Sequence, residues 1–234
     1  MPDLFTKGSL EMSATPLPHG DIAPMWSDCI VNRIAVLVIM ALLIVELADL
    51  IRLFPHLLRC ISLWKGNLDL EHSVNQARTR NTLALVTALV LCVFADRWIF
   101  TNSSVRGSLP VEWRLAFSAG QIGGYVVLRM LLYLLTKFRS KTSEYALCLR
   151  HSMYNYQIML TVLMLTSVLF LLVFRAPDSV VSMVLHIEFG LFTLLYLVRY
   201  AQILASRCSI FITILYLCAL EILPLGILAF VCTL

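Results

Sequence analysis

The stretch YQIMLTVLMLTSVLFLLVF, from Tyr156 to Phe174, contains no charged residue and is dominated by leucine, valine and methionine. A helix needs roughly 20 predominantly apolar residues to cross the hydrocarbon core of a bilayer. The run lacks the alternation of polar and apolar residues that is typical of a transmembrane barrel strand. It therefore predicts a membrane-spanning helix.

Similar stretches recur along the chain on both sides of this one. The predicted spans are 30–53, 81–100, 115–138, 156–174, 180–200 and 210–231. The 234 residues are 60% hydrophobic and 14% charged, with a mean hydropathy of +0.86, whereas soluble domains carry about 25% charged residues. This composition excludes an ordinary soluble enzyme, a disordered chain and a disulfide-stapled secreted module. We expect an all-α fold, a polytopic membrane bundle with six transmembrane helices.

The segments outside the spans are short. Residues 1–28 are polar and rich in proline, and they lack the charged and apolar regions of a cleavable signal peptide, so we expect a flexible tail followed by one six-span domain over 29–234. Residues 54–68 repeat apolar side chains at helical spacing, with Arg59 and Lys65 on the other face. This pattern predicts an amphipathic helix on the membrane surface. A helix buried against the bundle is an equally good interpretation.

Lysine and arginine are more numerous in the first, third and fifth connections than in the other connections. Because such residues collect on the cytoplasmic side, these connections should face the cytoplasm, and six spans then place both termini on the outer, periplasmic side. Trp26, Trp98 and Trp113 fall at the outer boundary, as expected of interfacial anchors.

Three ionisable residues are predicted at a similar depth towards the cytoplasmic side. Counting about 1.5 Å per residue from the outer boundary puts Glu46 and Asp49 of the first span level with Arg129 of the third. A charge at the centre of a span costs about 2.5–3.5 kcal/mol on insertion scales, so an ion pair from Arg129 to Glu46 or Asp49 is expected. Such a pair could staple two helices together, or Arg129 could extend to the headgroups instead.

Glu188 and Glu221 are predicted to form an outer layer, with His186 about one turn closer to the surface and no basic residue at that level. Carboxylates without a cation in lipid can hold a proton near neutral pH, so these residues are candidates for a proton or polar relay. Pro224 is expected to kink the last helix, because proline lacks the amide that would bond the Leu220 carbonyl. The alternative is that a protonated Glu221 only hydrogen-bonds between helices.

The third span carries small residues at intervals of four, namely Ala116, Gly120 and Gly124. This spacing lets another backbone approach closely and is typical of helix packing in membranes. The packing partner is either another helix of the same chain, which is the preferred interpretation, or a second copy.

Motifs for cofactor or metal chemistry are missing from the sequence. The five histidines are scattered, the seven cysteines form no CxxC pair, and no phosphate loop or nucleophile elbow occurs. We therefore expect no metal, no cofactor, free thiols and no nucleic-acid partner. The expected partners are membrane lipids and, in addition, a membrane protein or a second copy of the chain.

The last span contains the run LYLCALEILP, from Leu215 to Pro224. This run resembles the C-terminal signature of an uncharacterised family of multi-pass membrane proteins from Bacteroidota, described as a domain of unknown function. The resemblance extends over about the C-terminal third of the chain. It implies the inner membrane of a two-membrane bacterium and emphasises Glu221 and Pro224, but it brings no activity.

Three classes of function are consistent with these patterns; the first is the preferred interpretation and the other two are its alternatives. The first is a non-enzymatic subunit or assembly factor of an envelope complex, favoured by the short extramembrane segments. The second is a small proton-coupled transporter that uses buried carboxylates, favoured by Glu188, Glu221 and Pro224. The third is a membrane enzyme acting on a lipid or polyprenyl substrate, which would depend on Arg150, His151 and Tyr154 at the headgroups.

Overall fold

A computed structural model describes residues 26–62, 74–100, 108–135, 143–206 and 209–233. The long helices are α1 (Ile30–Ser62), α3 (Val74–Phe94), α5 (Val111–Leu135), α6 (Ser143–Val173) and α7 (Asp178–Ala205). A last span consists of α8 (Ile210–Leu217), the π turn η3 (Cys218–Ile222) and α9 (Leu223–Thr233). Two shorter elements are the 3-10 turn η1 (Trp26–Asp28) and the π turn η2 (Ala95–Ile99).

The predicted all-α fold is confirmed. Six helices in the described residues are long and apolar enough to cross a membrane, and the protein is a multi-pass membrane protein. Most of its exposed side chains are leucine, isoleucine, valine and phenylalanine, which suit a surface that faces lipid rather than water.

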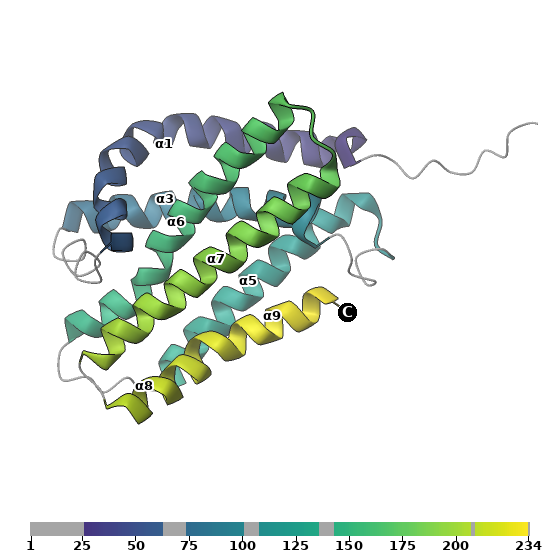
Figure 1. Ribbon diagram of the computed structural model, residues 1–234. Helices are drawn as coiled ribbons and strands as arrows, with labels where there is room; N and C mark the ends of the chain where they lie inside the picture. The colour runs from purple at the N-terminus through teal and green to yellow at the C-terminus, as the bar shows by residue number, and fades with distance from the viewer. Residues whose placement is uncertain (1–25, 63–73, 101–107, 136–142, 207–208, 234) are drawn as a thin grey trace, which may run out of the picture.

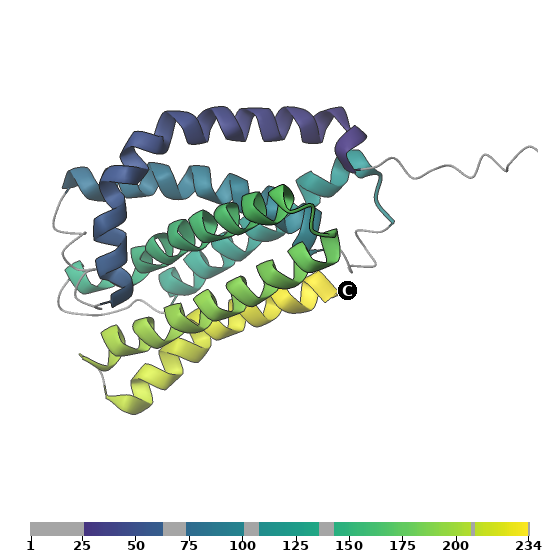
Figure 2. The same ribbon diagram turned by 45° about the horizontal axis from the view of Figure 1, so that its top comes forward.

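The helices form a bundle in which α3 is the most enclosed span and α1 is the outermost (Figure 1). Helix α3 packs against α1 on one side and against α6 and α5 on the other. Helix α7 lies beside α6, and α5 runs next to α9. The described chain begins with η1 at the same end of the bundle at which α9 finishes, as an even number of crossings requires (Figure 2).

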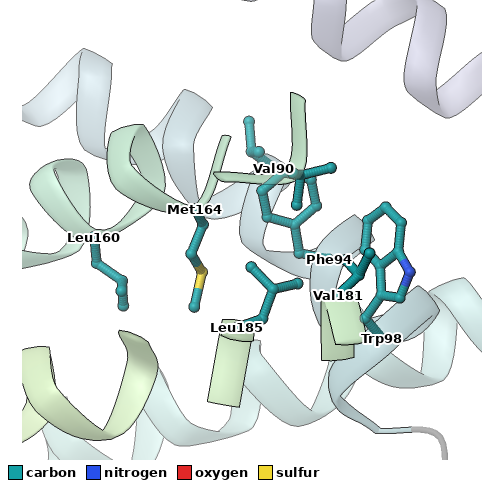
Figure 3. Close-up of a cluster of buried hydrophobic side chains, with 8 residues drawn as sticks. Val90, Phe94, Trp98, Leu160, Met164, Val181 and Leu185 are labelled. Carbon is teal, nitrogen blue, oxygen red and sulfur yellow. The ribbon is translucent and has the colours of Figure 1, made fainter. Parts of the chain in front are cut away.

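The main apolar core lies between α3, α6 and α7. Figure 3 shows Met164 of α6 and Leu185 of α7 facing each other, with Phe94 and Trp98 at one end of the cluster. The rings of Phe94 and Trp98 meet edge to face with centroids 5.7 Å apart. This core holds the two sides of the bundle together by dispersion and close packing, which drive helix association where lipid removes the hydrophobic effect.

The predicted surface helix at 54–68 is partly described. Its first residues continue α1 past Pro55, and the last part of α1 turns across the end of the bundle (Figures 1 and 2). Leu57 and Cys60 are fully buried against residues of α3 and α6, whereas Leu58 and Arg59 are exposed. Up to Ser62, the helix is therefore packed against the bundle, and residues 63–68 lie outside the described part of the chain.

Candidate functional site

A buried ion pair joins α5 to the last span. Arg129 Nη2 lies 2.8 Å from Glu221 Oε1, and Arg129 Nε donates to both carboxylate oxygens at 3.2 and 3.1 Å. The Glu221 side chain is 0% exposed and that of Arg129 is 7% exposed. Both charges are therefore removed from lipid and water and neutralise each other.

Three tyrosine hydroxyls complete the coordination of this pair. Arg129 Nη2 donates to Tyr196 of α7 at 2.8 Å, and the Tyr133 hydroxyl donates to Glu221 Oε1 at 2.9 Å. The hydroxyls of Tyr133 and Tyr200 are 2.7 Å apart. A hydroxyl has only one proton, so Tyr200 donates to Tyr133, which donates to Glu221. We refer to these five residues as the Arg129–Glu221 cluster.

The local backbone explains why Glu221 stands at this point. Pro224 has no N–H, and its ring would collide with the carbonyl of Leu220 in a regular helix. The chain widens into a π turn just before Pro224, where the Leu223 N–H donates to the Cys218 carbonyl, five residues back. The π turn η3 thus lies directly before Pro224, the residue predicted to kink the last helix, and Glu221 lies within this turn.

The predicted ion pair of Arg129 with Glu46 or Asp49 is wrong. Arg129 binds Glu221, and Asp49 lies 3.9 Å from Arg52 on the exposed side of α1. The physical reason is the order of the helices, because α3 lies between α1 and much of α5, while η3 and α9 pack directly on α5. Equal depth in the membrane does not make two helices neighbours.

The predicted outer layer of Glu188 and Glu221 is also wrong. Glu221 lies beside a guanidinium and beside Tyr196 and Tyr200, which are about 12 and 18 Å further along α7 than Glu188. The side chains of Arg129 and Tyr133 reach Glu221 from α5, although the sequence analysis assigned Arg129 and Glu221 to different layers.

Glu188 has a different environment, at the contact of α7 with α6. Its Oε1 accepts a short hydrogen bond from the Ser167 hydroxyl. Its Oε2 is buried and has no hydrogen-bond partner among the described residues. His186 is exposed, and its Nδ1 lies 2.7 Å from the carbonyl of Ser182 on its own helix. The structure therefore does not bring the three relay candidates together.

A second buried carboxylate, which the sequence analysis did not single out, lies in η2. Asp96 is 0% exposed and accepts hydrogen bonds from Trp26 Nε1 at 2.7 Å and Ser118 Oγ at 3.0 Å. The neighbouring Arg97 lies over the rings of Trp26 and Trp98, with its guanidinium carbon 5.0 and 4.8 Å from their centroids. The end of the predicted flexible tail is thus fastened to the bundle through Trp26.

The small-residue stripe on α5 does not pack inside the chain. Ala116, Gly120 and Gly124 are all exposed, and a Cβ atom added at Gly120 or Gly124 would meet nothing within 4 Å. The preferred prediction of an intramolecular partner is therefore wrong for the described residues. The stripe faces away from the Arg129 face of the same helix.

The remaining candidates are metal ligands and the residues predicted at the headgroups. No group of three or more histidine, cysteine, aspartate or glutamate residues that could hold a metal occurs in the part of the chain that the structure describes. His151 stacks on Tyr154 with centroids 5.5 Å apart, and the side chain of Arg150 lies outside the described set.

Sequence reasoning missed the three tyrosines. Their signal was present, because Tyr133 follows Arg129 by four residues and Tyr200 follows Tyr196 by four, which puts each pair on one helix face. The spacing could indicate a polar face on each helix, but not that the two faces meet at Glu221.

No protein-family model, curated protein or solved structure matches this chain. The resemblance of the last span to a Bacteroidota family therefore stays a prediction. Any function has to be argued from the Arg129–Glu221 cluster and from the surfaces of the bundle.

Proposed function

We propose that this multi-pass membrane protein is a small proton-coupled carrier of an anionic solute, with the Arg129–Glu221 cluster as its exchange site. The observation that carries the proposal is the position of a fully buried ion pair at a π turn in the middle of a span. Ionisable residues inside a membrane mark substrate or proton pathways by default, and π turns are frequent at functional sites.

Electroneutrality supplies the coupling. If Glu221 takes up a proton, Arg129 loses the carboxylate that neutralises it, which costs several kcal/mol. An entering anion removes that cost, because it replaces the carboxylate beside the guanidinium. The site is thus neutral either with ionised Glu221 alone or with a proton and an anion together. Proton and anion would therefore bind and leave as a pair.

The neighbouring groups suit an anion with several oxygen atoms. Arginine presents a planar fork of donors that matches a carboxylate or a phosphate. Tyr133, Tyr196 and Tyr200 place further hydroxyls at the guanidinium and carboxylate, and Tyr216 of α8 packs nearby. A small carboxylate or inorganic phosphate is the solute class that fits these donors.

The break in the last span provides a means of movement. Discontinuous helices form the substrate sites of many secondary transporters, because interrupted backbone can shift without breaking a regular ladder. Here η3 separates α8 from α9, so a local change at η3 would withdraw the Glu221 side chain from Arg129.

The experiment is a flux assay in liposomes that contain the purified protein and an internal pH dye. An inward gradient of phosphate or of lactate, each of which can enter as a monoanion with one proton, should acidify the interior. Glu221→Gln should abolish the acidification, whereas Glu46→Gln on α1 should retain it. Glu221→Asp, which keeps the charge, provides a folded variant with partial activity. An equal signal in wild type and Glu221→Gln, or no signal from either anion, would contradict the proposal.

A subunit or assembly factor of an envelope complex is the second candidate, and the exposed stripe on α5 favours it. Ala116, Gly120 and Gly124 offer a close-approach surface that no described helix of the chain fills. Purification of the tagged protein from native membranes in nanodiscs would test for a partner. Gly120→Leu should release that partner, and an unchanged complex would count against this interface.

The membrane and the orientation are proposals as well. The distribution of lysine and arginine supports cytoplasmic first, third and fifth connections, with both termini outside, and the resemblance of the last span supports a bacterial inner membrane. Reporter fusions that are active on only one side of the membrane, placed after residue 70 and after residue 104, should give opposite signals.

A further inference from the structure

The buried face of α5 carries polar side chains along most of its length. Ser118, Gln121, Tyr125, Arg129 and Tyr133 follow one another at spacings of three or four residues, which puts them on one side of the helix. Ser118 is fully buried, and Tyr125 is 8% exposed. We call these five residues the polar file of α5.

The two ends of the polar file contact the two buried carboxylates. Ser118 donates to Asp96 of η2, and Arg129 and Tyr133 donate to Glu221 of η3. Ser118 and Arg129 are about 16 Å apart along the helix axis. The file thus extends from the Asp96 end of the bundle to the ion pair, over about half the thickness of a hydrocarbon core.

Gln121 stands between the two ends and is the informative residue. Its Nε2 and Oε1 atoms are both buried, and neither has a hydrogen-bond partner among the described residues. An amide buried without partners loses roughly 1–3 kcal/mol per unsatisfied group. Ordered water normally removes this cost where several polar groups surround it, and Ser118 and Tyr125 lie one turn away on either side.

We propose that water molecules bound at Gln121 link Asp96 to the Arg129–Glu221 cluster and form the proton path of the carrier. The proposal rests on the proposed function for its purpose, but the bound water has its own physical basis. A proton entering at Asp96 passes along hydrogen-bonded water to the cluster and forms an O–H bond on Glu221. The anion beside Arg129 balances the charge, and no other bond of the protein changes.

The alternative carboxylate, Glu188, does not fit the same path. It lies on α7 and accepts a hydrogen bond from Ser167 of α6, and these two helices also contribute Met164, Val168 and Leu185 to the main apolar core. The polar file therefore gives Asp96, rather than Glu188, the role of first proton acceptor.

Hydroxyl-radical footprinting of the purified protein tests for the bound water, because radicals formed from buried water modify adjacent aromatic rings. Tyr125 is the probe and Tyr156 of α6 is its matched control, since both are buried tyrosines at 8% and 4% exposure and the Tyr156 hydroxyl donates to the Cys60 carbonyl. Tyr125 should be modified several-fold faster than Tyr156, and Gln121→Leu should remove the difference. Equal rates in the wild-type protein would overturn the proposal.

The same variant separates the path from the function. In the liposome assay, Gln121→Leu should slow the proton signal at least tenfold while the Arg129–Glu221 pair stays intact. Faster modification of Tyr125 than of Tyr156 without any proton-coupled flux would support the bound water and contradict the proposed carrier function. Flux that persists in Gln121→Leu, together with equal modification rates of Tyr125 and Tyr156 in the wild-type protein, would support the carrier function and contradict the proposed proton path.

Discussion

Two π turns interrupt the described helices, and each presents a fully buried carboxylate to α5. Asp96 in η2 accepts hydrogen bonds from an indole and a hydroxyl, which are neutral donors. Glu221 in η3 is held by a guanidinium. The first turn ends a span, whereas the second lies inside one. Glu221 lies in mid-span, where the adjacent guanidinium offsets the cost of removing its charge from water.

The largest effect is expected from Glu221→Ala. It removes the carboxylate that neutralises the buried Arg129 charge and should lower the free energy of unfolding by about 3–5 kcal/mol. The double variant Arg129→Met/Glu221→Ala removes both charges and should recover most of that loss. Denaturant titration in detergent micelles measures both values. Equal losses in the single and double variants would show that charge neutralisation is not the role of Arg129.

Asp96→Ala should have the next largest effect. It leaves the Trp26 indole and the Ser118 hydroxyl without their acceptor, at a cost of about 2–3 kcal/mol. Asp96→Asn keeps one acceptor oxygen and should lose about half as much. The same titration gives both numbers. If Asp96→Ala lowers the free energy of unfolding as much as Glu221→Ala does, the carboxylates of the two π turns do not differ in how much they stabilise the protein.

Tyr133→Phe should have a smaller effect, because it removes one hydroxyl from the Arg129–Glu221 cluster and leaves the ion pair. We expect the free energy of unfolding to fall by about 1.5 kcal/mol, the lower end of the range for a hydrogen bond to a charged group. Tyr154→Phe is the control, since Tyr154 stacks on His151 outside the cluster. Thermal unfolding gives the midpoint temperatures of the two variants. Equal midpoints would show that the stability of the cluster does not depend on the Tyr133 hydroxyl.

Gly123→Ala should have the smallest effect and the opposite sign. Gly123 lies on α5 between the positions that contact the two turns, and an added Cβ would meet nothing within 4 Å. Alanine has the higher helix propensity, so the variant should gain up to about 1 kcal/mol. A lower stability of the variant, or the loss of a complex that the wild-type protein shows in native mass spectrometry, would indicate a partner on this face.

The fold was predictable because its signal is strong and local. Each span depends only on a continuous apolar stretch, such as Tyr156–Phe174, and lipid allows few alternatives to a helix there. The ends of the helices were less predictable, as α7 shows by continuing to Ala205 instead of ending at Tyr200.

The site was predictable only in its residue types. Arg129, Glu221 and Pro224 were each notable alone, because charge and proline are costly within a span. The pairing of Arg129 with Glu221 depends on which helices are neighbours, and lipid-facing sequences carry little information about that order. Asp96 was missed because it falls close to the predicted end of its span, where a carboxylate needs no special explanation.

The separation of Arg129 and Glu221 by 92 residues has a consequence for biogenesis. At about 5–20 residues per second, a ribosome needs roughly 5–18 s to synthesise the segment between them. During that interval α5 is held by the insertion machinery, or enters the bilayer, with its arginine uncompensated. Insertion of the last span therefore completes assembly, because it brings Glu221 to Arg129. A chain that stalls before α8 exposes an intramembrane charge by which membrane quality control can recognise and remove it.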